Sequence, residues 1–257
     1  AQGFGQLNLG TVMGSVNTYR MSNALKYQTP LMSGFQAGIA YSFATGYDAI
    51  YVQEKATSGT GYNYETSNNS RQLSLGAKYQ NGPVYVAASY DKLYGSNVVS
   101  PEASPSEWNI GGTYDFNVVK IAAAYGQTRG GWMAGQANQG NSGSALGIGG
   151  IPTGANVFGN GGLLFDSNWG VNSYMLGATV PVGAAGKVLA SWGMARPNGN
   201  MQDSVVSSTN MNTYNLAYTY DFTKRTNLYA YVSYANNYAT IDGLNSTVVG
   251  LGMRHQF

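Results

Sequence analysis

The sequence closes with the stretch Val248-Val249-Gly250-Leu251-Gly252-Met253-Arg254-His255-Gln256-Phe257. Residues two apart lie on the same face of a β-strand, so this stretch separates into two unlike faces. One face carries Val249, Leu251, Met253 and Phe257, and the other carries Val248, Gly250, Gly252, Arg254 and Gln256. An apolar outer face, a small or polar inner face and a terminal aromatic residue suit a strand of a barrel in a lipid bilayer. The alternative is an ordinary amphipathic edge strand, because alternation is common.

The composition favours a membrane barrel over a soluble domain. The 257 residues include no Cys, 36 Gly and 21 Tyr, and only 9% are charged, whereas a soluble domain carries about 25% charged residues. No stretch approaches the roughly 20 consecutive apolar residues of a transmembrane helix. The mean hydropathy is only −0.21, as expected when lipid-facing and lumen-facing residues alternate. The net charge of +2 argues against a nucleic-acid-binding protein, which would carry a concentrated basic patch.

Apolar and polar residues alternate along nearly the whole chain and predict twelve strands. These are Phe4–Gly10, Asn23–Thr29, Phe35–Phe43, Arg71–Tyr79, Val84–Lys92, Glu107–Phe116, Val119–Gln127, Asn172–Val182, Lys187–Ala195, Thr213–Phe222, Thr226–Ala235 and Thr247–Phe257. The connections are alternately tight and long, which is typical of a meander with turns at one rim and loops at the other. We therefore expect an all-β fold, a transmembrane antiparallel up-and-down β-barrel. It forms a single domain over residues 1–257, with a long Gly-rich external loop at Thr128–Val171.

Aromatic residues gather at the two ends of the predicted outward faces. At the short-turn rim they are Tyr79, Phe116, Phe222 and Phe257, and at the long-loop rim they are Phe43, Tyr90, Trp108, Tyr125 and Tyr234. Strand propensity alone explains why aromatic residues are present, but it does not explain why they lie at the ends. The placement predicts two aromatic girdles at the headgroup levels of the bilayer.

The charged residues of the predicted strands fall mainly on the inward faces. The inward cations are Lys26, Lys78, Lys120, Lys187 and Arg254, and the inward acids are Asp91, Glu107, Asp115 and Asp221. A Lys or Arg on the lipid face at mid-bilayer would cost about 2–4 kcal/mol, so this parity has a physical cause. An excess of cations would favour anions in a pore. The alternative is that the lysines only solvate the wall and bias selectivity little.

Several stretches carry a resemblance to a known family. They are Gly5-Gln6-Leu7-Asn8-Leu9-Gly10, Asn23-Ala24-Leu25-Lys26-Tyr27-Gln28-Thr29-Pro30, Asn172-Ser173-Tyr174-Met175-Leu176-Gly177-Ala178, Thr223-Lys224-Arg225-Thr226 and the C-terminal stretch. On these motifs the chain resembles the general porins of Gram-negative bacteria, particularly the beta-proteobacterial, anion-preferring group. The resemblance implies an outer-membrane location, contact with outer-membrane lipid, and recognition of Phe257 by the assembly machinery.

The sequence departs from the family pattern in two ways. Family members have sixteen strands, and this chain begins at what looks like the fifth, so four strands and most of the constriction loop are expected to be missing. The loop that narrows the family's pore is represented only by Thr11–Ser22, without a carboxylate. The family's homotrimer contacts involve the missing strands and are not carried over. A shortened pore, a natural deletion and a part of a longer protein all remain open.

The function that these features predict is passive diffusion of small hydrophilic solutes and ions, with small anions weakly favoured. An enzyme is not expected, because the only histidine, His255, lies on a lipid-facing position without a plausible catalytic partner. No metal or nucleotide motif occurs, so neither a metal nor another cofactor is expected. A structural or engineered shortened barrel, its lumen partly plugged by Thr128–Val171, is the alternative.

Overall fold

The computed structural model describes residues 12–13, 23–43, 71–94, 104–132, 164–198, 209–237, 242–243 and 245–257. Its strands are β1 (Ala24–Gln28), β2 (Phe35–Ser42), β3 (Arg71–Asn81), β4 (Val84–Tyr94), β5 (Ser106–Asp115), β6 (Lys120–Trp132), β7 (Leu164–Val182), β8 (Gly186–Pro197), β9 (Met211–Asp221), β10 (Thr226–Asn236) and β11 (Ser246–His255). Among these residues no helix is long and apolar enough to cross a membrane.

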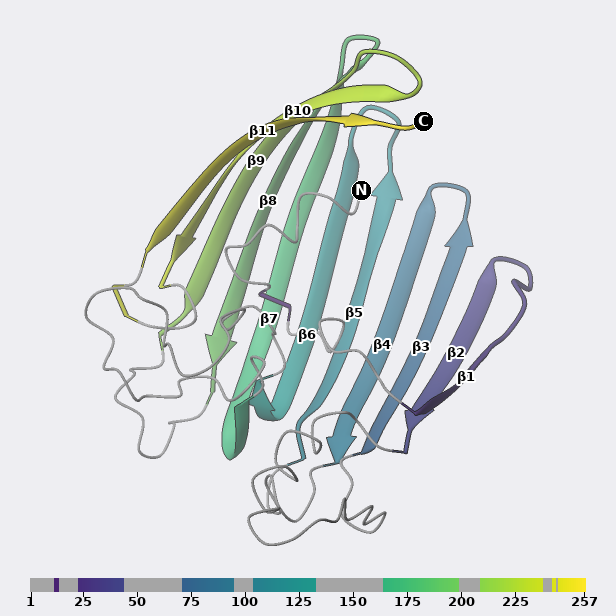
Figure 1. Cartoon of the computed structure of the whole chain (residues 1–257), viewed down its shortest axis with the longest axis vertical. Helices are drawn as coiled ribbons and strands as arrows, with labels where there is room; N and C mark the ends of the chain where they lie inside the picture. The colour runs from purple at the N-terminus through teal and green to yellow at the C-terminus, as the bar shows by residue number, and fades with distance from the viewer. Residues whose placement is uncertain are drawn as a thin grey trace, which may run out of the picture.

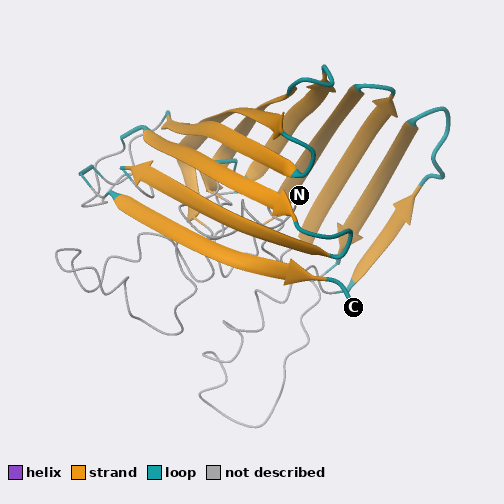
Figure 2. Cartoon of the chain, turned by 90° about the horizontal axis from the view of Figure 1, so that it is seen from above, coloured by secondary structure: helices purple, strands orange, loops and turns teal. Residues whose placement is uncertain are grey.

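The strands form one sheet in which every strand pairs with its neighbours in sequence. The order runs from β1 to β11 without a crossover, and the pairings are antiparallel. The sheet curves into a trough (Figures 1 and 2). This arrangement confirms the predicted all-β, antiparallel up-and-down fold. The predicted strand Phe4–Gly10 lies outside the described residues.

Tight turns join alternate strand pairs along one rim, which is the upper rim in Figure 1. Gly82, Asn117 and Gly183 hold the left-handed backbone that such turns need, with φ of 53°, 67° and 64°. The Asp115 carboxylate accepts the backbone N–H of Asn117 at 2.9 Å. These residues fix where each hairpin reverses, and therefore its register.

The strands beside the predicted Gly-rich loop run farther than predicted. β6 continues to Trp132 and β7 begins at Leu164, whereas the other strand ends lie within two residues of prediction. The register shifts within the extension, because Arg129 lies opposite Gly170 and Gly131 lies opposite Phe165. Gly130 takes φ of 72° there, a conformation that costs glycine little. The loop bounds Thr128–Val171 were therefore too wide. Residues 133–163, the middle of the loop predicted to plug the lumen, lie outside the described part of the chain.

The two faces of the sheet differ as the alternation predicts. Outward residues such as Leu176, Leu216 and Leu251 are 54%, 51% and 84% exposed. The buried non-glycine residues of the strands, such as Gln72, Glu107 and Ala195, lie on the opposite, concave face. Tyr85 is the exception among the exposed large hydrophobic side chains of the described strands, because its parity is inward. An exposed apolar face this continuous needs an apolar solvent or partner to cover it.

Glycines of the C-terminal strand make room for tyrosines of the strand beside it. Tyr231 lies opposite Gly250 and Tyr229 opposite Gly252. A Cβ added at Gly250 would lie 2.5 Å from the Tyr231 ring, and the two rings stack with centroids 6.5 Å apart. The inward glycines thus let the aromatic rings cover the strand backbone.

The parity of β8 gives a direct test of which face meets lipid. Ala190→Lys puts a charge on the outward face near the middle of the strand, and Leu189→Lys puts the same charge on the concave face. We expect Ala190→Lys to lower the free energy of unfolding in lipid vesicles by about 2–4 kcal/mol, and Leu189→Lys to lower it less. If urea titrations showed the same decrease in the free energy of unfolding for the two variants, the assignment of the lipid-facing and concave faces would be wrong.

Candidate functional site

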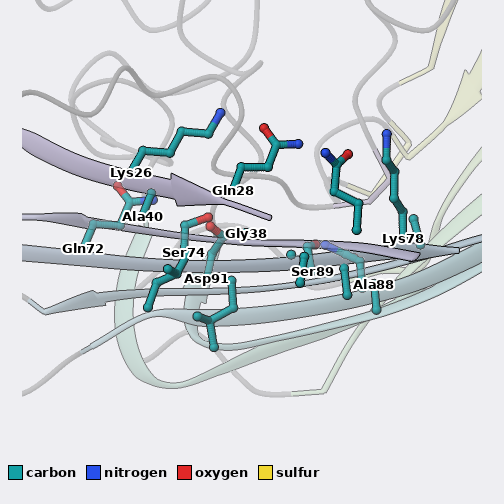
Figure 3. A pocket seen from close by; sticks show the side chains of 18 of the residues that line it. Lys26, Gln28, Gly38, Ala40, Gln72, Ser74, Lys78, Ala88, Ser89 and Asp91 are labelled. Carbon is teal, nitrogen blue, oxygen red and sulfur yellow. The ribbon is translucent and has the colours of Figure 1, made fainter. Parts of the chain in front are cut away.

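A hollow of about 620 Å³ lies against the concave face of β1 to β5. Its inward lining combines two cations, Lys26 and Lys78, with the carboxylate of Asp91, the ring of Tyr85, amides and small residues. Figure 3 shows Lys26, Gln28 and Lys78 projecting to the same side of the sheet. Small and polar side chains leave this wall open and wettable, which suits contact with water and hydrophilic solutes.

The register separates the two lysines of this hollow. Lys26 lies opposite Ala40 of β2, and Lys78 lies opposite Gln36 of the same strand. The two lysines lie two strands apart across the sheet and four residues apart along the strand direction, so their Cα atoms are about 16 Å apart. The two charges therefore act on a solute as separate points along the wall and do not form one clamp.

Ion pairs neutralise two of the other predicted inward cations at the short-turn rim. Lys120 Nζ lies 3.1 Å from Asp115 Oδ2, and Lys187 Nζ lies 3.6 Å from Asp221 Oδ2. The four side chains are about half exposed, so the pairs contribute little to stability. Their effect is to cancel most of the field that each lysine would project into the trough.

The remaining inward charges lie at opposite ends of the wall. Arg254 lies opposite Asn227 near the short-turn rim. Asp91 and Glu107 lie opposite each other nearer the long-loop rim, and Glu107 is only 1% exposed. Asn109 donates a hydrogen bond from Nδ2 to Glu107 Oε1. Four of the inward cations therefore lie in the short-turn half of their strands, whereas Lys26 shares a register row with Asp91 and Glu107 in the other half.

Two residues of the expected constriction segment lie against the concave face. Val12 is only 7% exposed. A Cβ added at Gly193 of β8 would lie 2.5 Å from Val12 Cγ2, and one at Gly126 of β6 would lie 3.0 Å from Met13 Cε. The described start of the segment Thr11–Ser22, Val12 and Met13, therefore lies inside the trough. No strand pattern in the sequence could have located it.

The predicted outward aromatic residues lie at the strand ends, with neighbours that the sequence analysis did not include. At the long-loop rim Trp108 packs edge-on against Tyr125, with ring centroids 5.3 Å apart, and Tyr125 contacts Tyr174 at 5.1 Å. At the short-turn rim Phe116 packs against Tyr114 at 4.4 Å. The other members that the structure describes lie in the same two regions: Phe43, Tyr90 and Tyr234 near the long-loop rim, and Tyr79, Phe222 and Phe257 near the short-turn rim.

The described residues contain neither a metal-ligating cluster nor a histidine on the concave face. Among them, no group of three or more His, Cys, Asp or Glu side chains could hold a metal ion. His255 faces outward, where Nδ1 lies 2.9 Å from Thr226 Oγ1 and the ring packs edge-on against Phe257 at 4.7 Å. These contacts suit an interfacial aromatic residue rather than a general base.

Sequence comparisons place the chain among outer-membrane proteins. The family described as Gram-negative porin matches residues 2–240. An outer membrane porin protein of Bordetella pertussis is 42% identical over 258 residues, which cover 99% of this chain and 62% of the relative. Outer membrane porin protein 32 of Delftia acidovorans is 27% identical, over 94% of this chain and 58% of the relative. The chain thus spans about 60% of the length of these relatives.

Solved structures with the same fold agree with this assignment. OmpT of Vibrio cholerae, expressed in the outer membrane, matches with a TM-score of 0.56 at 13% identity, over 93% of this chain and 67% of that one. Salmonella typhi OmpF, in complex with daunomycin, matches with a TM-score of 0.55 at 15% identity, over 91% and 62%. The family match over residues 2–240 shows that the chain belongs to the Gram-negative porin family of the outer membrane.

Proposed function

We propose that this chain lines a water-filled pore through which small hydrophilic solutes and ions diffuse passively, with a weak preference for anions. The observation that carries the proposal is the concave wall, where a hollow of about 620 Å³ is lined by Lys26, Lys78, a single carboxylate (Asp91), amides and small residues. Such a wall sorts solutes by size and by weak electrostatic bias, and it needs no chemical step or cofactor.

The charge balance supports a weak preference rather than a strong one. Five cations and four acids face inward in the described strands. The ion pairs Lys120–Asp115 and Lys187–Asp221 cancel two of these cations. Lys26, Lys78 and Arg254 form no ion pair with another described residue, so they supply the bias, and water in the pore screens each charge within about 10 Å at 0.1 M salt.

A pore of this kind has a direct electrical signature. The protein inserted in a planar bilayer under a KCl gradient should give stable open steps and a small zero-current potential of anion-selective sign, since the inward cations outnumber the acids. Insertion of folded protein without any conductance would contradict the proposal and favour an occluded barrel. A conducting pore with a cation-selective potential would refute only the anion preference.

Removal of cations from the wall and removal of acids from it should shift the zero-current potential in opposite directions. Lys26→Gln with Lys78→Gln removes two cations and should shift the zero-current potential toward cation selectivity. Asp115→Asn with Asp221→Asn releases Lys120 and Lys187 from their ion pairs and should shift it toward anion selectivity. The two double variants alter the same number of charges, so each is the control for the other. Shifts of the same sign would refute the wall assignment.

We also propose that the C-terminal residue is recognised by the outer-membrane assembly machinery. Phe257 is fully exposed, and only its edge-on packing against His255 orients the ring. Phe257→Ala should lower the amount of folded protein in the outer membrane, while its refolding in detergent should remain unchanged. If the variant lost as much folded protein in detergent refolding as in the outer membrane, the ring would have a purely structural role.

A further inference from the structure

The concave face of β8 to β11, the green to yellow strands of Figure 1, carries two neighbouring aromatic rings. Of the inward side chains described on the strands, only Tyr85, Tyr229 and Tyr231 are aromatic. Tyr229 and Tyr231 follow each other on the inward face of β10, and both are half-buried. On β11 the register places Gly252 beside Tyr229 and Gly250 beside Tyr231.

Each of these two rings turns one face to the strand and the other to the trough. A Cβ added at Gly250 would lie 2.5 Å from both Cε1 and Cζ of Tyr231 and 2.6 Å from its Oη. Nearly equal distances to three adjacent atoms place this glycine under the face of the ring and not at its edge. A Cβ at Gly252 would likewise lie 2.5 Å from Tyr229 Oη and 2.6 Å from Cζ. Because the two ring planes differ by only 23°, both rings present their second face in the same direction.

Hydrogen-bonded side chains border the rings toward the long-loop rim. Ser191 of β8, Asn215 of β9 and Ser233 of β10 lie in one row across the sheet. Asn215 donates from Nδ2 to Ser191 Oγ at 3.2 Å, and its Oδ1 accepts from the Ser233 hydroxyl. A hydroxyl has one donor and two acceptor positions, so Ser191 can still donate and Ser233 can still accept. This row offers both kinds of hydrogen-bonding group to a solute that lies on Tyr231.

A cation borders the rings toward the short-turn rim. Arg254 lies two residues beyond Gly252 on the inward face of β11. The acid of the same row, Asp221, is paired with Lys187, and Arg254 forms no ion pair with a described residue. Two residues of rise separate the rows by about 7 Å, which an arginine side chain can span. A solute on Tyr229 can therefore reach the guanidinium.

We propose that these residues, which we call the tyrosine patch (Tyr229, Tyr231, Arg254 and the row of Asn215), bind sugar acids of one or two pyranose units. A pyranose has a C–H face that packs on an aromatic face, and a rim of hydroxyl groups that needs donors and acceptors. A unit on Tyr229 directs its carboxylate to Arg254, which binds it by charge-assisted hydrogen bonds, and a second unit on Tyr231 reaches Asn215.

The inference rests on the proposed pore and names a class of solute that the pore retains briefly. Only one face of the solute contacts the wall, so the binding is weak enough for the solute to leave, as conduction requires. The covering of the β11 backbone uses the other face of each ring, and it does not compete with the sugar.

The first test measures how far each solute reduces the single-channel KCl conductance of the whole chain in a planar bilayer. Galacturonate, a pyranose acid, should reduce the conductance saturably, at a lower concentration than galactonate, its open-chain counterpart of the same charge. Digalacturonate offers one ring to each tyrosine and should act at a lower concentration than galacturonate. Equal half-saturating concentrations for galacturonate and galactonate would overturn the stacking on tyrosine.

Single substitutions then locate the contact. Tyr229→Leu should raise the half-saturating concentration of galacturonate roughly fivefold, because the loss of an aromatic face weakens packing, whereas Tyr229→Phe should leave it within about twofold. The matched control is Tyr85→Leu, which removes the inward tyrosine of β4 and should have no effect. Arg254→Gln should weaken galacturonate roughly threefold to fivefold and leave the uncharged sugar galactose unchanged. Equal weakening by Tyr229→Leu and Tyr85→Leu would show non-specific attraction to the wall and overturn the patch.

Two further measurements separate a failure of the patch from a failure of the pore or of folding. Heat-modifiable gel mobility reports whether each variant is folded. An open KCl conductance that no sugar acid reduces would overturn the patch and leave the proposed pore in place. Saturation-transfer NMR on the folded protein in detergent detects the contact without a current: the ring protons of galacturonate should receive saturation from the parent protein and much less from Tyr229→Leu. Equal transfer from the two proteins would also overturn the patch.

Discussion

The constraint on which this structure depends is that a backbone in hydrocarbon must satisfy its own hydrogen bonds. No water reaches the backbone there, so every N–H and C=O needs a partner within the protein. A sheet of neighbouring antiparallel strands meets that need, and its pleat sends successive side chains to opposite sides. This alternation explains why the outward faces of β2 to β11 are apolar and the concave face is polar. Because apolar and polar residues alternate along each strand, their contributions cancel in the mean hydropathy. The aromatic and charged residues then take the positions where the solvent changes from lipid to headgroup to water.

The two faces use charge in different ways. On the concave face, acids and bases share the same water, so Lys120 and Lys187 are paired with Asp115 and Asp221, and the net field is small. On the outward face, Arg129 is oriented by an amide and by backbone carbonyls, so its charge is oriented but not cancelled. Both arrangements orient a side chain, but an ion pair cancels the charge, whereas neutral acceptors leave it in place.

Much of the fold was predictable, because it depends on local rules. Strand parity, tight turns and strand ends follow from a period of two and from residues such as Gly82 and Gly183, so the sequence specifies them nearly to the residue. The extension of β6 and β7 was missed because the register shifts at Gly130, and a glycine in a Gly-rich region carries no distinct signal. The position of Val12 and Met13 against Gly193 and Gly126 was missed because a tertiary contact of a loop has no periodicity. The ion pairs could be located only once the register placed Lys120 opposite Asp115.

Pairing between sequence neighbours alone, from β1 to β11, bears on how a pore of this kind can change size during evolution. Each strand takes its register from its two adjacent hairpins, so the information for one pairing is not spread over distant parts of the chain. Removal or duplication of a hairpin would leave the other pairings and their in–out parity intact, and it would change the circumference by one pair of strands. Pore diameter, which grows with strand number, can therefore vary in discrete steps without a new fold. The selectivity of each version depends on the few side chains that line its wall.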